Sequence, residues 1–256
     1  MSLQPVLLLA LFAFAAAMLP SRAEQLVTAL SHDRVSISSN FTGTQVVVFG
    51  TIERDAQTVA RAGGYDIVVT LAGPMTTLVT RRKERTFGIW INADSEVIGQ
   101  VPSFLSIHTT GPISDIASDT ARARLGLGLD MLPINVEPTA KPPVRTSFEN
   151  AFLRLMLDEN RYSQIVGGVE VMGANLFRAT ITLPATISVG EYTAKVQLFR
   201  GGALLSTTTE TLRIGKIGFE QYVSEVAKTH GFLYGLATVA IACLTGWVAG
   251  VVFRRD

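Results

Sequence analysis

Short runs in which apolar and polar residues alternate occupy much of the first half of the chain. Val35 and Ile37 alternate with serines, for example, and residues 38–43 supply a turn before the next run. Runs of this kind, rich in Val, Ile, Thr and aromatic residues and bounded by Gly, Pro, Asn and Asp, are typical of β-strands. The pattern predicts a β-rich N-terminal unit over residues 24–131. One helical stretch is expected within it, from Ser114 to Leu127, with Ser114 or Asp115 as its N-cap.

A proline-rich stretch follows this unit. Residues 132–146 hold four prolines and predict a linker. Beyond it, Thr146 and Glu149 form a capping box for a helix that reaches about Tyr162. The apolar face of this helix is made by Phe148, Phe152, Leu155 and Met156.

Strand patterns return after the helix and continue to residue 216. Alternation is clear in the run 192–199, where one face is made by Tyr192, Ala194, Val196 and Leu198. The pair Gly201–Gly202 predicts a tight turn to the last run. We therefore expect a mainly β protein built from two small immunoglobulin-like sandwiches, one over 24–131 and the other, with its leading helix, over 147–216.

One short segment combines basic and apolar residues. The stretch RRKERTFGIWIN, residues 81–92, begins with four cations, which are Arg81, Arg82, Lys83 and Arg85. The simplest interpretation is the solvated basic turn of a β-hairpin, after which Phe87, Ile89 and Ile91 face one side and Trp90 the other. An alternative is an anion-binding or partner-docking patch, because guanidinium groups suit oxyanions and carboxylates. A contact with membrane headgroups is a third interpretation.

The N-terminus has the pattern of an export signal. Val6 to Leu19 is an unbroken apolar run of 14 residues, and Ser21 and Ala23 are small residues at the −3 and −1 positions of a cleavage site. A run of this length is short for a membrane span. We expect residues 1–23 to be a signal peptide, with an uncleaved N-terminal anchor as the alternative.

The C-terminus predicts a membrane helix. Residues 231–253 carry no charge over 23 positions, and Arg254 and Arg255 follow in a short tail, 254–256. This length spans a bilayer, and the arginine pair places the tail in the cytoplasm. A juxtamembrane helix is expected over 217–230. Small residues on one face of the membrane helix, Gly235, Ala242, Gly246 and Gly250, predict close packing against a partner helix or a second copy of the chain.

Composition narrows the range of functions. The net charge of +1 argues against a large basic surface for nucleic acid. The only cysteine, Cys243, lies in the predicted membrane helix, so the exported part holds no disulfide and no thiolate ligand. His32, His108 and His230 are far apart in sequence, and we find no nucleophile or phosphate-binding motif. We therefore expect no enzyme activity, no metal and no cofactor.

Several segments together resemble a known family. They include LVTALSHDRVSISSNFTGTQVVVFG, VTRRKERTFGIWIN, PSFLSIHTTGP, LFRATITLPATISVGEYTAKVQLFRGG and FLYGLATVAIACLTGWVAGVVFRR. The chain is similar over essentially its whole mature length to the alpha-proteobacterial transmembrane protein family Alph_Pro_TM. The resemblance implies an exported β-rich region on one C-terminal membrane helix, and it brings no catalytic residues. Because family members are often encoded beside a sulfite-exporter-like permease, it also implies a membrane partner.

These observations lead to one expected function and one alternative. We expect a non-enzymatic, single-pass inner-membrane protein, with its N-terminal region in the periplasm, that serves as an accessory module for a membrane partner such as a sulfite-exporter-like permease. The alternative is a periplasmic oxyanion-binding module that uses the basic residues at 81–85.

Overall fold

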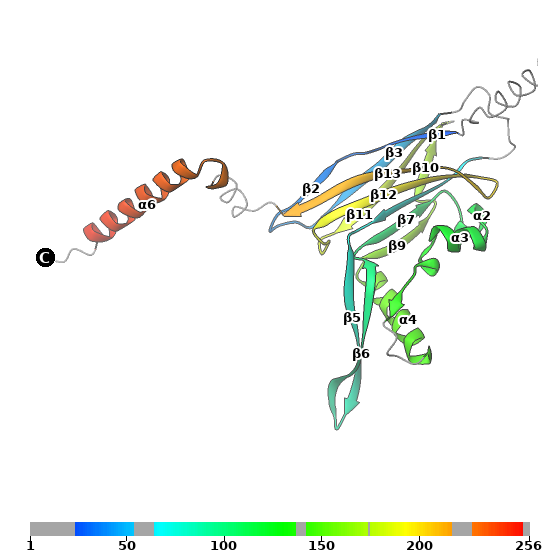
Figure 1. The fold of residues 1–256 in the computed structure, drawn as a ribbon, viewed down its shortest axis with the longest axis horizontal. Helices are drawn as coiled ribbons and strands as arrows, with labels where there is room; N and C mark the ends of the chain where they lie inside the picture. The colour runs from blue at the N-terminus through cyan, green and yellow to red at the C-terminus, as the bar shows by residue number, and fades with distance from the viewer. Residues whose placement is uncertain (1–23, 54–63, 137–141, 174, 217–226, 253–256) are drawn as a thin grey trace, which may run out of the picture.

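The computed structural model describes residues 24–53, 64–136, 142–173, 175–216 and 227–252, and these form a mainly β protein with a separate C-terminal helix (Figure 1). The predicted signal peptide (1–23) and the tail (254–256) lie outside the described residues, as does most of the predicted juxtamembrane helix. Residues 227–229 of that segment are helical.

Four strands form the first sheet, in the order β1-β3-β11-β10. They are β1 (Gln25–Leu30), β3 (Gly43–Glu53), β11 (Leu176–Pro184) and β10 (Val169–Met172). Every neighbouring pair is antiparallel. The alternation of β11 explains its place, because Phe177, Ala179, Ile181 and Leu183 are buried while the residues between them are exposed.

Six strands form the second sheet, in the order β2-β13-β12-β4-β7-β9. They are β2 (Arg34–Ile37), β13 (Ala203–Lys216), β12 (Gly190–Arg200), β4 (Asp66–Ala72), β7 (Leu105–Thr109) and β9 (Tyr162–Val166). The two edge pairs, β2 with β13 and β7 with β9, are parallel, and the inner pairs are antiparallel. The predicted alternation in β12 and the turn at Gly201–Gly202 are confirmed, with both glycines at positive φ.

The two sheets enclose the larger hydrophobic core. One cluster of buried residues joins Val46, Val48 and Ile52 of β3 and the inward residues of β11 to Val69 and Leu71 of β4 and to Tyr192, Val196 and Leu198 of β12. The Tyr192 hydroxyl donates to the Ser188 carbonyl at 2.7 Å, so its polar end is satisfied at the edge of this core.

The strands of the two predicted units share the same sheets. β3 pairs with β11 from Thr51–Leu176 to Gly43–Pro184, and β4 pairs with β12 from Ala72–Thr193 to Asp66–Phe199. The expected boundary at 132–146 therefore does not separate two sandwiches, because both sheets need strands from both sides of it. The expected immunoglobulin-like arrangement is not confirmed either, since the parallel edge pairs differ from the antiparallel sheets of that fold.

Helices cover the outer face of the six-stranded sheet. They are α2 (Ile113–Ile116), α3 (Asp119–Leu125), the 3-10 turn η1 (Leu129–Met131) and α4 (Pro142–Asp158). A second core holds Val68 and Ile107 of the sheet against Ile116, Leu127, Phe152 and Met156 of this layer. Tyr162 is buried there, its ring edge-on to Phe152 and its hydroxyl donating to the Pro102 carbonyl at 2.7 Å.

The helix boundaries correct three expectations. The stretch 114–127 forms two short helices, and the cap of the second is Ser118, whose hydroxyl accepts from the Ala121 amide. Helix α4 already begins at Pro142, inside the predicted linker, and ends at Asp158. Its face of Phe148, Phe152 and Met156 is buried as predicted, whereas Leu155 is exposed. Tyr162 is not helical, because it is the first residue of β9, the edge strand that pairs with β7.

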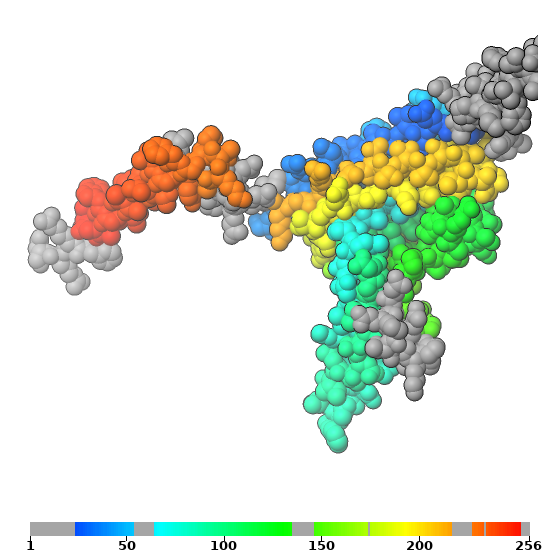
Figure 2. Space-filling view, in the orientation of Figure 1, coloured from blue at the N-terminus to red at the C-terminus, as the bar shows by residue number. Residues whose placement is uncertain are grey.

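A long hairpin extends from the body. It consists of β5 (Met75–Thr86) and β6 (Ile89–Pro102), with the short strand β8 (Asn135–Val136) paired near the base of β6. The base packs on the second core through Leu78, Ile98 and Val101. Figures 1 and 2 show the outer half of the hairpin projecting beyond the sheets and helices. Residues from Arg81 to Arg85 and from Ile89 to Ser95 are all exposed.

The last helix, α6 (Gly231–Val252), matches the predicted membrane segment. At about 1.5 Å per residue its 22 residues reach roughly 33 Å, which is enough for a hydrocarbon core of about 30 Å. Among the described residues this is the one helix long and apolar enough to cross a membrane. Its two threonines satisfy their hydroxyls within the helix, Thr238 on the Tyr234 carbonyl (2.5 Å) and Thr245 on the Ile241 carbonyl (2.6 Å). Such bonds suit a helix in lipid, where water cannot satisfy these groups.

Candidate functional site

The four cations predicted as a turn lie on strand β5. Arg81, Arg82, Lys83 and Arg85 pair with residues Ser95 to Trp90 of β6, so the hairpin is confirmed but its turn lies further along the chain. The turn is the pair Phe87–Gly88, because Thr86 pairs with Ile89. Its tip is therefore apolar and not basic. Trp90 is 69% exposed, so this strand does not carry its side chain into the interior.

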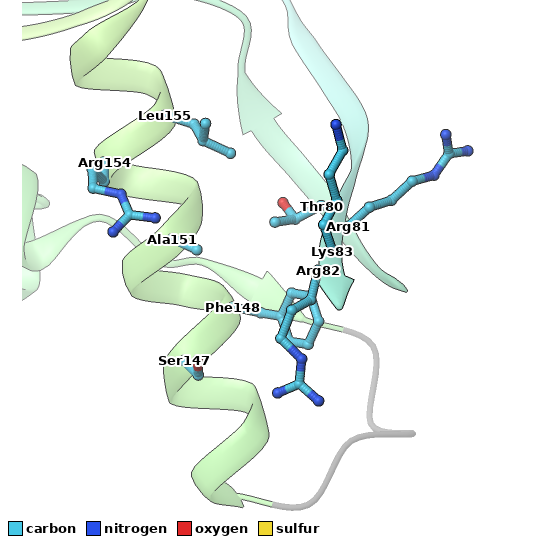
Figure 3. Close-up of a pocket in the computed structure, with 9 residues that line it drawn as sticks. All are labelled: Thr80, Arg81, Arg82, Lys83, Ser147, Phe148, Ala151, Arg154 and Leu155. Carbon is cyan, nitrogen blue, oxygen red and sulfur yellow. The ribbon is translucent and has the colours of Figure 1, made fainter. Parts of the chain in front are cut away.

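A groove separates β5 from α4 (Figure 3). It encloses about 380 Å³ and is lined by Thr80, Arg81, Arg82, Lys83, Ser147, Phe148, Ala151, Arg154 and Leu155. Three cations of the predicted patch thus share this groove with a fourth, Arg154, from the opposite wall. Arg85 is not part of the lining. The groove gathers positive charge beside an apolar floor, which is a setting for an anion with an apolar portion.

The cationic groups in this groove do not converge on one point. Arg82 forms an ion pair with Asp94 across the hairpin, so part of its charge is already neutralised. In Figure 3 the Arg81 side chain extends away from α4, and the Arg82 and Lys83 side chains point to opposite ends of the groove. Tight oxyanion sites hold their donors around a single position, often with paired guanidinium bonds. The groove is therefore open and basic, and it has no single position around which several donors meet.

A second cavity lies between β7, β9 and β11. It encloses about 340 Å³ and is lined by Ser106, His108, Asn160, Ser163, Ile165, Thr180, Thr182 and Pro184. His108 Nδ1 lies 3.3 Å from the Gly168 carbonyl, and its Nε2 lies 3.0 Å from the Ser106 hydroxyl. Because a carbonyl only accepts, Nδ1 carries the proton and Nε2 accepts from Ser106. The Ser106 hydroxyl also lies 2.8 Å from that of Ser163.

Burial governs the chemistry of this Ser–His–Ser chain. Desolvation lowers the pKa of His108, and the bond to the Gly168 carbonyl acts in the opposite direction. Ser106 and His108 are 2% and 3% exposed. The Ser106 hydroxyl lies at the cavity wall and is hydrogen-bonded to both His108 and Ser163. The chain of hydrogen bonds satisfies these buried polar groups along β7 and β9.

The predicted packing face lies along α6. Gly235, Ala242, Gly246 and Gly250 are all exposed, and a Cβ added at any of the three glycines meets nothing within 4 Å. Steps of four and seven residues place these positions on one face. The backbone of α6 is thus open to close approach on that side.

Two features of the hairpin and groove were missed at the level of sequence. The first is the apolar turn, for which Phe-Gly between alternating runs was a usable signal, since two-residue hairpin loops favour glycine. The second is Arg154, whose place opposite β5 depends on how α4 packs and has no local signature. Among the described residues, no group of three or more His, Cys, Asp and Glu side chains could hold a metal ion.

Comparison with known proteins is consistent with the apolar helix α6 and the β-sheets described above. A family model described as "Putative transmembrane protein (Alph_Pro_TM)" matches residues 25–255. No curated protein matches the chain. The match covers both β-sheets, the helical layer, the hairpin and α6, so it applies to the whole architecture described above. The chain belongs to the Alph_Pro_TM family of transmembrane proteins.

Proposed function

We propose that this protein is a non-enzymatic accessory module, anchored by α6 in the inner membrane with its β-sheets in the periplasm, and that it assembles with an integral-membrane partner such as a sulfite-exporter-like permease. The tail after α6 carries Arg254 and Arg255, which favours a cytoplasmic C-terminus. The signal-like segment 1–23 favours export of the region that precedes α6.

The observation that carries the proposal is the open small-residue face of α6. In lipid there is little hydrophobic drive between helices, so association depends on close backbone contact. An anchor alone needs only apolar bulk, and leucine would serve as well as glycine at these positions. Glycine also lowers helix stability, so a row of small residues on one exposed face fits a helix that packs against another.

The test replaces the open face and compares it with a matched change elsewhere. The Gly246→Leu/Gly250→Leu variant should insert normally, because leucine is favourable in the bilayer, but should lose partner or self-association. The control, Ala237→Leu/Ala240→Leu, adds apolar bulk on the opposite side of α6, where both alanines are also exposed.

The readout is copurification from native membranes in mild detergent, normalised to the amount of protein inserted. We expect the control to retain its partners and the glycine variant to lose them. Full retention of every partner by the glycine variant would show that α6 is only an anchor.

A second candidate function rests on the basic groove between β5 and α4. The positions of Lys83 and Arg154 on the two walls of this groove of about 380 Å³ favour an oxyanion-binding module. Calorimetry of the purified chain with sulfite and with sulfate tests it. Binding should weaken in Arg154→Gln and persist in Arg124→Gln, an exposed arginine of α3 outside the groove. Equal affinity in the two variants would place any anion elsewhere.

A further inference from the structure

The turn of the β5–β6 hairpin has an unusual residue at its first position. Phe87 has φ +51° and Gly88 has φ +87°, so both central residues of this two-residue loop are in the left-handed region. Such turns strongly favour Asn-Gly, Asp-Gly or Gly-Gly. A bulky phenylalanine is disfavoured there because its Cβ crowds the backbone. The requirements of the turn itself do not account for Phe87.

The tip exposes more apolar surface than Phe87 alone. Phe87 is 103% exposed, Ile89 65%, Trp90 69% and Ile91 41%. Arg85 and the residues from Asn92 to Ser95 are exposed as well, so the tip packs on nothing else in the described protein, whereas Arg81 to Lys83 line the groove beside α4. Figure 2 shows this arm standing clear of the body. Four large apolar side chains at the end of a free arm indicate a surface that is covered by something else.

The apolar side chains lie on both faces of the hairpin. Ile89 and Ile91 are two residues apart on β6 and share one face, while Trp90 lies on the other face, opposite Arg85. A protein groove or a sheet edge covers one face of a two-stranded ribbon. A lipid phase surrounds the tip on all sides, and it is the environment that matches this distribution.

Apolar and charged residues also lie at different distances from the tip of the hairpin. At about 3.4 Å per residue, the apolar segment from the turn to Ile91 extends roughly 10 Å, with Arg85 level with Trp90, and the stretch from Lys83 to Arg81 occupies roughly the next 10 Å. Three cations, Arg81, Arg82 and Lys83, against Asp94 leave this second layer positive. Interfacial membrane segments bury aromatic and aliphatic residues about 5–10 Å deep and hold Lys and Arg at the level of the phosphates.

We propose that the tip of the β5–β6 hairpin, Phe87 to Ile91, inserts into the interface of the lipid bilayer, with Arg81 and Lys83 at the phosphates. The lipid surface is a second contact with the membrane, in addition to α6. Because α6 tethers the body to the same bilayer, the tip meets lipid at high effective concentration and needs little intrinsic affinity.

The chain offers a direct reporter of this contact. It contains two tryptophans, Trp90 in the tip and Trp247 in α6. In a full-length Trp247→Phe protein, the remaining tryptophan emission comes from Trp90. We would reconstitute this protein, without partners, in nanodiscs of phosphatidylethanolamine and phosphatidylglycerol with brominated acyl chains. We expect blue-shifted emission, quenching by the brominated lipid and protection from aqueous iodide.

The matched variant adds Phe87→Asn in the same background. Asn-Gly is a favoured pair for this turn, so the hairpin should be at least as stable. Loss of the phenylalanine should reduce the ratio of inserted to solvent-exposed tip by about tenfold or more, which lowers the brominated-lipid quenching of Trp90.

Three outcomes contradict the proposal. Trp90 that is accessible to iodide and unquenched by lipid shows a free tip. Trp90 that is protected from iodide but unquenched by lipid shows a tip covered by protein, for example by a second copy of the chain. Quenching that is unchanged by Phe87→Asn shows that the tip residues do not drive the contact. None of these results bears on the α6 face, which is tested separately by copurification.

Discussion

Separating the chain into residues 24–136 and 142–216 should leave neither part folded. The six-stranded sheet places β12 between β4 and β13, and the four-stranded sheet places β11 beside β3. Each part therefore loses the inner neighbours of its own strands. A strand edge of this kind exposes backbone donors and acceptors together with one apolar face.

The size of the effect follows from the core between the sheets. Nine of its 21 buried residues come from the first part, and all nine are Val, Leu, Ile or Phe. Burying one such side chain contributes about 1.5–3 kcal/mol, so the nine together contribute about 14 to 27 kcal/mol. Losing half of that burial removes about 7 to 13 kcal/mol, whereas the free energy of unfolding of a whole domain is about 5–15 kcal/mol.

The assay compares the two parts alone, mixed, and in the full chain. Circular dichroism and urea titration should show no cooperative transition for either part alone and recovery of one in the mixture. The full chain in detergent is the reference. If residues 24–136 alone unfold cooperatively at a urea midpoint close to that of the full chain, the two sheets do not depend on both parts and the reasoning fails.

Three smaller predictions use single positions. Gly50→Ala would bring a Cβ to 2.3 Å from the Val27 carbonyl oxygen, so it should lower the free energy of unfolding by about 1–3 kcal/mol. The control is Gly99→Ala, whose Cβ would meet nothing within 4 Å and which should change that free energy by less than about 1 kcal/mol. Equal urea midpoints for the two variants would contradict this prediction. Burial lowers the folded-state pKa of His108, so the unfolded state binds the proton first as the pH decreases. The free energy of unfolding should therefore fall as the pH decreases from about 6.5 to the folded-state pKa. The His108→Gln variant should show a flatter melting temperature over that pH range. Tyr162→Phe leaves a buried carbonyl without its donor and should cost about 1–3 kcal/mol in the same titration, and an unchanged midpoint would show that water replaces the hydroxyl.

Local patterns predicted individual elements well and their partners poorly. The alternation of Tyr192 to Leu198 and the apolar face of α4 depend only on residues near one another in the chain, so the sequence predicts them. The pairing of β3 with β11 joins residues more than a hundred positions apart, and no local signal encodes it. The proline-rich stretch predicts a boundary because four prolines favour a linker. Two of them, Pro142 and Pro143, instead begin α4, where proline is tolerated in the first turn.

The basic cluster shows a different limit. The sequence predicts Arg81 to Arg85 as the turn of a hairpin, with Phe87 and Trp90 on opposite faces of the strand that follows. A hairpin that leaves the body has no buried face, so alternation there carries no information about an interior. The positions of the cations were correct, but the location of the tip depended on the type of turn at Phe87–Gly88.

The strand order also has a consequence for synthesis. Strands are made in chain order, and β13, which flanks β12, ends at Lys216, only 14 residues before α6 begins. At about 5–20 residues per second, roughly 10 to 40 s separate the appearance of β1 from that of β13. For most of that interval β3 and β4 exist without β11 and β12, and their apolar faces are open to chaperones, proteases and other nascent chains. The sheets can close only when the ribosome is already making the membrane helix, so folding and membrane insertion of this chain coincide in time.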